Sequence, residues 1–385
     1  MSRISRRVAL ALALLALIVA ALAGAGTSAS APAATAKTPP PNPIKGLVKS
    51  LKGMSLSARE AKLLSLAKQE GQVNVYTSLS SLVLKPLQAA WAKQYPDVKL
   101  NVYRASSEDV TARILAERNA GTSGADVVET NGTNMLIFQG HFKDILVPYR
   151  QSPYSKGVPK IYRFDAFTAD RIEKFVVAWN TNLVPAGQEP KSFSDLANPK
   201  WKGKLAMEPT DTDWFATLYT YMLHHGGPKG KPMKKAKLNA LWRAIAANSQ
   251  FINGHTTEAN LLAAGQIQVI VSGHAQSLEQ LQAKKAPISF TPFVKPVIER
   301  PQGIGIVYRL QHQAAALLFY DWMLSSTGQK LLQANGVEPA NPRFPDNAFL
   351  SNPKTIRVDL RPVVRHYGAW QKFYSSFTHV GGGRG

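Results

Sequence analysis

The feature that most constrains the fold is a regular alternation of short apolar segments with longer amphipathic ones in the first part of the chain. Strands are expected at residues 73–78, 99–104 and 125–130, and helices at 57–69, 82–96 and 107–121, with another helix beginning near Gly132. Strands that alternate with helices of this length form a parallel sheet, because each helix carries the chain back to the start of the next strand. The sequence therefore predicts an α/β fold.

The same pattern continues through the second half of the chain. Strand-like segments are found at residues 171–182, 202–209, 268–273, 288–293 and 303–309. Helical segments are found at residues 213–226, 238–248, 257–264 and 313–336, the last one broken at residues 325–327, and a short helix is expected within residues 363–377. Two capping signals fix helix starts: Ser57 with Glu60 forms a capping box, and Ser107 is the expected N-cap of the third helix.

Composition narrows the class of protein. The chain has 385 residues, which at roughly 100–200 residues per domain predicts two or three domains. It contains no cysteine, which excludes a disulfide scaffold, a cysteine zinc site, an iron–sulfur centre and a lipid-modified cysteine. The formal charge of +22 could serve an anionic ligand, but net charge describes the surface more than a cleft, so a basic surface is the preferred interpretation.

Residues 1–31 have the pattern of a signal peptide. Arg3, Arg6 and Arg7 precede an apolar run over residues 8–23, and Ala29-Ser30-Ala31 fits an A-x-A cleavage site. The alternative is an uncleaved membrane anchor, but the run is shorter than the ~20 residues that a spanning helix needs. Residues 32–56 begin with a Pro- and Ala-rich stretch and are expected to form a tether. We therefore expect an exported protein, soluble after signal cleavage, that has no nucleic-acid partner.

Polar residues follow the predicted strands at their carboxyl ends, next to helix starts. In an open α/β sheet, ligands bind beyond these ends, where free amides and hydroxyls can hold an anion or a carboxylate. The candidate ligand-binding residues are Ser78, Ser80, Ser107, Asn131 and Thr133 from the first half and Thr210, Asp211, Trp214 and His274 from the second half. Each could instead be a helix cap, and Trp214 and His274 could be structural. Several in register predict a polar cleft between two halves.

Five segments resemble the exported solute-binding proteins of ATP-driven uptake systems, in the branch that contains ferric-iron-binding proteins. They are EGQVNVYTSLSS (70–81), GADVVETNG (124–132), FVVAWNTNLVP (175–185), SFSDLANPKWKGKLAMEPT (192–210) and AALLFYDWMLSSTGQKLLQANGVEPANP (315–342). The resemblance covers residues 60–345. It implies a two-lobe periplasmic-binding-protein (type II) fold with hinge crossover strands, a ligand trapped between the lobes, and no catalysis.

The resemblance also implies a division of the chain. Residues 57–174 would form the first part of lobe 1, and residues 175–300 would form lobe 2 with its crossover strand. Residues 301–385 would contain the return crossover, the late helix pair and a basic tail. The protein, a monomer located in the periplasm, would deliver a small polar ligand, anionic or a chelated metal, to the membrane permease of an ABC transporter.

Direct binding of ferric iron is not expected. The ferric members hold the metal with two consecutive tyrosines after the strand matching 268–273, where this chain has Gly273-His274-Ala275-Gln276-Ser277. Asn131 stands where those members often have a glutamate, and a serine replaces a histidine after the first strand. Ferric iron prefers anionic oxygen ligands, and only Glu129 and Asp211 remain as candidates. We therefore expect no metal ligands and no cofactor.

Two other function classes stay open at this level. An exported α/β hydrolase would use Ser272 or Ser78 as nucleophile, although the chain contains none of the G-x-S-x-G, H-E-x-x-H, P-loop or G-x-G-x-x-G motifs. A sensory or surface-interaction module on the same binding fold would need no permease. The preferred interpretation is a binding protein and not an enzyme.

Overall fold

The computed structural model describes residues 39–227, 230–344 and 355–378. Its strands form one sheet in the order β2-β1-β3-β9-β4-β7-β5-β6. Lobe 1, as we use the term, contains the parallel strands β1 (Gln72–Thr77), β2 (Lys99–Arg104) and β3 (Val127–Asn131). Lobe 2 contains the parallel strands β5 (Leu205–Met207), β6 (Ser249–Phe251) and β7 (Val269–His274). The mixed α/β architecture agrees with the predicted fold class.

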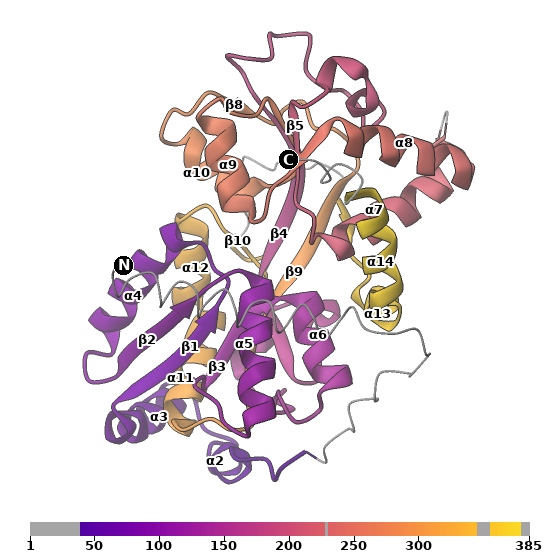
Figure 1. The fold of residues 1–385 in the computed structure, drawn as a ribbon. Helices are drawn as coiled ribbons and strands as arrows, with labels where there is room; N and C mark the ends of the chain where they lie inside the picture. The colour runs from indigo at the N-terminus through magenta and orange to yellow at the C-terminus, as the bar shows by residue number, and fades with distance from the viewer. Residues whose placement is uncertain (1–38, 228–229, 345–354, 379–385) are drawn as a thin grey trace, which may run out of the picture. The chain divides into compact units, whose positions relative to one another are not determined.

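Two long antiparallel strands connect the lobes. β4 (Phe167–Asn180) and β9 (Val297–Ile306) pair from Phe167 opposite Gly305 to Phe175 opposite Ile298, and Figure 1 shows them running between the two groups of elements. Every residue of β4 is buried, so its charged side chains lie inside the protein. The boundaries expected at 174/175 and 300/301 fall within these strands, because each strand belongs to both lobes.

The helices of lobe 1 cover its parallel strands. They are α3 (Leu56–Glu70), α4 (Ser81–Gln94), α5 (Ser107–Ala120), α6 (Gly132–His141), α11 (Gln313–Leu324) and α12 (Ser326–Ala334). α3 packs on α11, where Arg59 and Asp321 form a buried ion pair at 2.6 Å. The N-caps of α3 and α5 are Ser55 and Ser106, not the expected Ser57 and Ser107. Both have extended backbone, which lets the hydroxyl accept a hydrogen bond from the amide three residues later.

Lobe 2 has four α-helices among the described residues. They are α7 (Thr212–His225), α8 (Lys235–Ala247), α9 (His255–Ala263) and α10 (Ala275–Gln282). The short elements are η1 (Pro153–Gly157), η2 (Lys160–Tyr162), η3 (Asp195–Ala197), η4 (Pro199–Trp201), β8 (Ile288–Ser289) and β10 (Glu338–Pro339). α10 was not expected from the sequence. It starts directly after β7, so its first turn lies beside the carboxyl end of that strand.

The C-terminal tail joins both lobes. It contains β11 (Thr355–Arg357), α13 (Leu360–Arg365) and α14 (Tyr367–Thr378), where the sequence predicted only a short helix. β11 pairs with β9, α13 packs against α6 of lobe 1 and α7 of lobe 2, and α14 packs against α7 and α8. Tyr374 stacks on Phe215 with ring centroids 4.5 Å apart, so α14 packs into the core of lobe 2.

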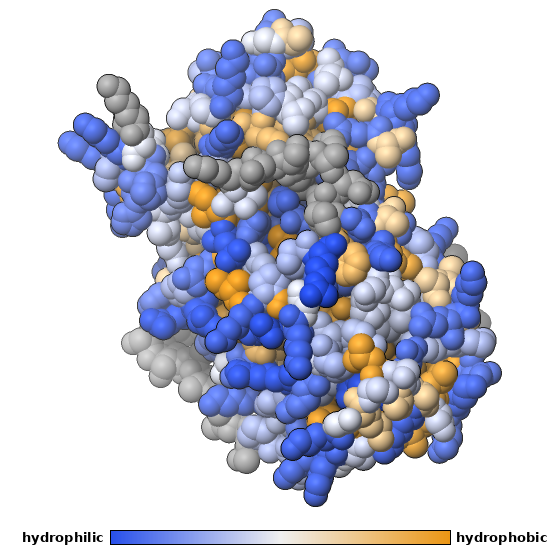
Figure 2. Space-filling view, turned by 180° about the vertical axis from the view of Figure 1, so that it is seen from behind, coloured by the Kyte–Doolittle hydropathy of each residue, from blue (hydrophilic) through white to orange (hydrophobic). Residues whose placement is uncertain are grey.

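Of the two segments expected at the N-terminus, the structure describes only part of the tether. The expected signal peptide lies outside the described residues. Within the expected tether, residues 45–50 form the helix α2 (Lys45–Ser50). None of the helices in the described ranges is both long and apolar enough to cross a membrane. The surface seen in Figure 2 is mainly hydrophilic with scattered apolar residues.

Candidate functional site

A cavity of about 650 Å³ lies between the lobes and is lined almost entirely by polar side chains. Lobe 1 contributes Ser78, Ser80, Arg104, Ser106, Ser107, Glu108, Asp109 and Asn131. Lobe 2 contributes Glu208, Thr210, Asp211, His255, Thr256, Thr257, His274, Gln276 and Ser277. The crossover strands contribute Arg171, Glu173, Arg300 and Gln302. A volume of this size is typical of a pocket for a small molecule.

Seven of the nine residues selected from the sequence line this cavity. They are Ser78, Ser80, Ser107, Asn131, Thr210, Asp211 and His274. Two of them are also helix caps: Asn131 Oδ1 accepts from the amide of Asn134 at 2.8 Å, and Ser80 Oγ accepts from Leu82 at 3.3 Å. The capping of a helix and the lining of a cavity are therefore compatible, since Asn131 still has its amide NH₂ group.

Thr133 and Trp214 do not line the cavity. Trp214 is 1% exposed and packs in the core of lobe 2, with its ring centroid 5.8 Å from that of Trp242 and 6.4 Å from that of Phe193. A large aromatic side chain in the first turn of α7 is buried there because that face of the helix covers the sheet. Thr133 is also buried, and its hydroxyl donates to Asp213 of the opposite lobe.

Six helices begin at the cavity. The residues that precede them, all cavity-lining, are Ser80, Ser106, Asn131, Asp211, Gly254 and His274. The three helices of lobe 1 are capped by side chains, whereas α7, α9 and α10 of lobe 2 have no side-chain cap. Unpaired amides and the helix dipole make such starts partially positive. These helix starts therefore place partial positive charge around the cavity, beside carboxyl groups that also line it.

The crossover strands supply a polar face that the sequence analysis did not identify. Arg171 lies opposite Gln302 and Glu173 lies opposite Arg300, so the four side chains are on the same side of the β4/β9 ribbon. The signal was present as a cluster of charged residues, Asp170-Arg171-Ile172-Glu173-Lys174, in a strand whose next residues are apolar. A strand with a buried polar face needs a reason for that face, and here the reason is the cavity.

The two crossover arginines are each paired and still keep a free donor. Arg171 Nη1 lies 2.7 Å from Glu129 Oε1, and Arg300 Nη1 donates to Asp213 Oδ1 at 2.9 Å. Within the described part of the chain, Nε of each has no hydrogen-bond partner, although both residues are at least 95% buried. Leaving a buried charged donor unpaired is costly, so a ligand acceptor would be favourable at this place.

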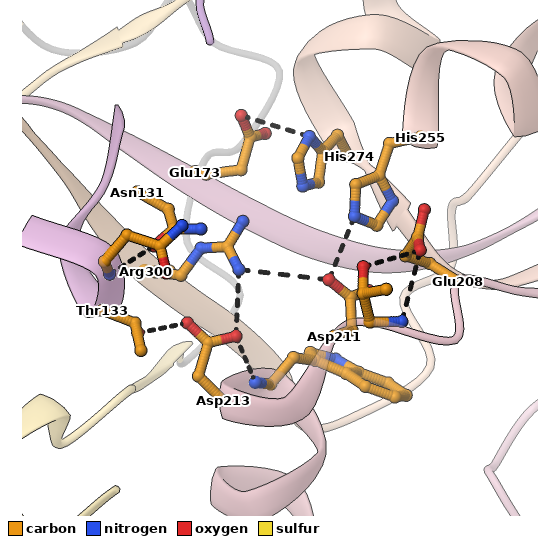
Figure 3. Close-up of polar contacts among 12 residues, drawn as sticks. Asn131, Thr133, Glu173, Glu208, Asp211, Asp213, His255, His274 and Arg300 are labelled. Carbon is orange, nitrogen blue, oxygen red and sulfur yellow. Dashed lines mark hydrogen bonds and ion pairs between the residues drawn. The ribbon is translucent and has the colours of Figure 1, made fainter. Parts of the chain in front are cut away.

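Two histidines are stacked at the lobe 2 side of the cavity (Figure 3). The ring centroids of His255 and His274 are 3.6 Å apart with an interplanar angle of 22°. His255 Nε2 lies 3.1 Å from Asp211 Oδ1, and its Nδ1 lies 3.3 Å from Glu258 Oε2. Burial alone would lower the pKa of His255, but the two carboxylates outweigh it and hold that pKa well above its usual value.

The second histidine has the opposite character. Burial and the charge of His255 hold the pKa of His274 well below its usual value. Its Nδ1 lies 3.5 Å from Glu173 Oε2, and burial raises the pKa of Glu173 to about 7. His274 Nε2 has no partner in the described residues. At neutral pH the stack therefore contains one charged and one neutral ring, and the neutral ring keeps a nitrogen for a ligand.

The carboxylates that the sequence left as possible metal ligands are engaged elsewhere. Glu129 is bound by Arg171 and by the hydroxyl of Thr77, and Asp211 is bound by His255. In the ranges that the structure describes, no group of three or more His, Cys, Asp or Glu residues is arranged to hold a metal ion. The geometry of the described site is that of a cavity for a polar molecule.

Two α/β lobes, two crossover strands and a polar cavity between them define a solute-binding protein of the periplasmic type. The model of the bacterial extracellular solute-binding protein family matches residues 87–357, and the chain belongs to this family. It is therefore a substrate-binding protein of the ABC-transporter type, and the prediction that it is not an enzyme is confirmed.

The chain is similar in sequence to a known protein and in fold to solved structures. The Fe(3+)-binding periplasmic protein of Serratia marcescens is 26% identical over 282 residues, which are 68% of this chain and 79% of that protein. The binding protein AfuA of Actinobacillus pleuropneumoniae, solved with exogenous fructose 6-phosphate, is 19% identical with a TM-score of 0.67 over 81% of this chain and 99% of AfuA. Apo ferric ion-binding protein A of Pasteurella haemolytica is 17% identical with a TM-score of 0.64, over 82% of this chain and all of that protein.

Proposed function

We propose that this protein captures a small, anionic, hydroxylated organic ligand between its two lobes and delivers it to the permease of an ABC uptake system. It acts after export, in the periplasm, as a monomer. The observation that carries the proposal is the pair of buried arginines, Arg171 and Arg300, which both line the cavity and whose Nε atoms have no hydrogen-bond partner among the residues that the structure describes.

The anionic part of the ligand is assigned to the crossover arginines and the surrounding helix starts. Arginine binds carboxylates and phosphates through charge-assisted hydrogen bonds. Arg104 adds a third guanidinium, which has no carboxylate within ion-pair distance in the described residues. On the lobe 1 and hinge sides of the cavity, these three guanidinium groups line the wall together with the carboxyl groups of Glu108, Asp109 and Glu173.

The hydroxylated part is assigned to lobe 2. Glu208, Asp211 and His274 line that side and offer acceptors for hydroxyl donors. A ligand with both an anionic group and hydroxyls satisfies both sides, whereas an inorganic anion would leave the lobe 2 acceptors without donors. A relative solved with a sugar phosphate, AfuA, supports this ligand class, and the ferric-binding relative makes a ferric chelate of a hydroxy acid the second candidate.

A panel of thermal melts on ligand-stripped full-length protein tests the proposal. It contains fructose 6-phosphate, fructose, inorganic phosphate, citrate, ferric citrate and ferric chloride. A ligand at 1,000 times its Kd adds about 4 kcal/mol to the free energy of unfolding, which raises Tm by several degrees. We expect a shift with an anionic hydroxylated compound and a smaller one or none with fructose. A Tm shift with ferric chloride and with no other compound contradicts the proposal. The absence of a Tm shift with every compound also contradicts it, provided that a control protein responds to its own known ligand.

A further inference from the structure

A buried contact joins the two lobes beside Arg300, which lines the cavity (Figure 3). Thr133, in the first turn of α6, donates its hydroxyl to Asp213 Oδ2 at 2.5 Å, and Asp213 is in the first turn of α7. Thr133 is 2% exposed and Asp213 is 4% exposed. A hydrogen bond between a hydroxyl and a carboxylate in such surroundings is strong and is costly to break.

The second oxygen of Asp213 is bound by the crossover strand. Asp213 Oδ1 accepts from Arg300 Nη1 at 2.9 Å and from the amide of Trp214 at 2.8 Å. The guanidinium of Arg300 lies over the ring of Phe175, 4.6 Å from its centroid. Arg300 also lines the cavity, opposite Glu173 on the neighbouring strand. One planar group thus borders the ligand cavity and holds the carboxylate that joins the lobes.

We propose that Thr133, Asp213 and Arg300 couple ligand binding to the relative position of the lobes. This inference rests on the proposed function, because it needs a ligand in the cavity. A ligand anion bound to Arg300 orients the guanidinium that holds Asp213, and Asp213 bonds to Thr133 only when the lobes are in this arrangement. The ligand then favours this arrangement to the extent that it binds the protein more tightly in this arrangement than in one where the Thr133–Asp213 bond is broken. Arg300 and Asp213 are positioning residues in this scheme.

The packing around the contact fits such a role. A Cβ atom on Gly132, the residue before Thr133, would lie 2.6 Å from the carbonyl oxygen of Pro301 and 3.0 Å from Leu360 Cδ1. The start of α6 therefore lies directly against β9, one residue from Arg300, and under the tail helix α13. Because α13 also packs on α7, the helices that carry Thr133 and Asp213 share one covering element.

The test compares Thr133→Val, which removes the hydroxyl at nearly constant volume, with Thr133→Ser, which keeps it. The chain has no cysteine, so Ala112→Cys on α5 and Ala283→Cys after α10, both exposed, allow clean spin labelling of the two lobes. Pulsed electron paramagnetic resonance then gives the distance between the lobes in the labelled full-length protein. The probe ligand is fructose 6-phosphate, with fructose as its uncharged control.

Without ligand, we expect Thr133→Val to broaden or shift the interlobe distance relative to wild type, and Thr133→Ser to restore it. With fructose 6-phosphate, we expect Kd to rise about five- to tenfold in Thr133→Val. An unchanged ligand-free distance distribution in Thr133→Val overturns the inference, even if no compound binds the wild type. If the wild type binds fructose 6-phosphate, and Thr133→Val binds it with the same Kd and shows the same ligand-induced change in interlobe distance, the coupling is overturned. The proposed function is then unaffected.

Discussion

The imidazole rings of His255 and His274 lie face to face with their centroids 3.6 Å apart. At neutral pH the ring of His255 is positively charged and the ring of His274 is neutral. His255 is charged because Asp211 and Glu258 flank it, whereas His274 is neutral because it is buried beside that charge. Glu173, next to His274, is a carboxyl group whose pKa is raised to about 7 by burial. The lobe 2 side of the cavity therefore carries groups whose protonation is set by the fold.

Glu173→Gln tests the protonation of this region. Because the pKa of Glu173 in the folded protein lies above its unfolded value, the folded state binds the proton more tightly, and the wild type loses stability as pH rises from about 4.5 to about 7. Glutamine carries no charge, so the variant should match the wild type at pH 5 and exceed it by about 1–3 kcal/mol at pH 8. Urea unfolding at both pH values measures this. The control is Asp97→Asn, at an exposed site; a Glu173→Gln gain that is equal at pH 5 and pH 8 would contradict the assignment.

Arg171→Lys tests the role of the crossover arginines in binding. A lysine ammonium can keep the ion pair with Glu129, but it cannot also present the second, planar set of donors to the cavity. We expect affinity for fructose 6-phosphate to fall about tenfold, equivalent to about 1.4 kcal/mol. The matched control is Arg243→Lys on the exposed face of α8. If Arg171→Lys and Arg243→Lys bind fructose 6-phosphate with equal affinity, Arg171 does not contribute to ligand binding.

Substitutions of Trp214 separate a core role from a ligand contact. Trp214→Ala should lower the free energy of unfolding by about 3–5 kcal/mol, because it leaves a cavity beside Trp242 and Phe193. Trp214→Phe should keep the ligand affinity of the wild type, since the side chain does not line the binding cavity. Calorimetry with both variants checks this. A loss of affinity in Trp214→Phe with unchanged Tm would restore the ligand contact that the sequence suggested.

Gly132 and Gly140, both in α6, provide a test variant and its matched control. A Cβ on Gly132 would meet the Pro301 carbonyl oxygen at 2.6 Å, whereas a Cβ on Gly140 would meet nothing within 4 Å. Gly132→Ala should therefore destabilise the protein by about 1–3 kcal/mol by displacing α6 from β9. Gly140→Ala should be neutral or stabilise it by up to about 1 kcal/mol through helix propensity. Similar unfolding free energies for the two variants would show that α6 does not need its close approach to β9.

Much of the fold follows from local sequence patterns. The strand at residues 99–104 and the break in the late helix pair are found where periodicity and turn residues place them. Helix starts are less certain from sequence, since neighbouring serines offer equivalent caps and only the backbone decides between Ser55 and Ser57. α10 was missed because its sequence, AQSLEQLQ, has only two leucines, and packing against α9 and β4 stabilises it.

The site was predictable only in part. Residues after parallel strands, such as Ser78 and Asn131, can be found because topology brings those ends together. Arg171 and Arg300 lie on antiparallel crossover strands, and their shared face depends on a register between segments 129 residues apart, which periodicity does not give. The role of the C-terminal tail likewise depends on its contacts with α6 and α7, which are far away in the sequence.

The central claim is that the cavity binds an anionic hydroxylated molecule, and calorimetric titration tests it most directly. Ligand-stripped full-length protein would be titrated with fructose 6-phosphate, with fructose and with inorganic phosphate under identical conditions. The account predicts saturable one-to-one binding of fructose 6-phosphate, weaker binding of phosphate and weaker binding of fructose. Binding of fructose as tight as that of its phosphate, or no saturable binding of any anionic compound in the panel, would contradict it.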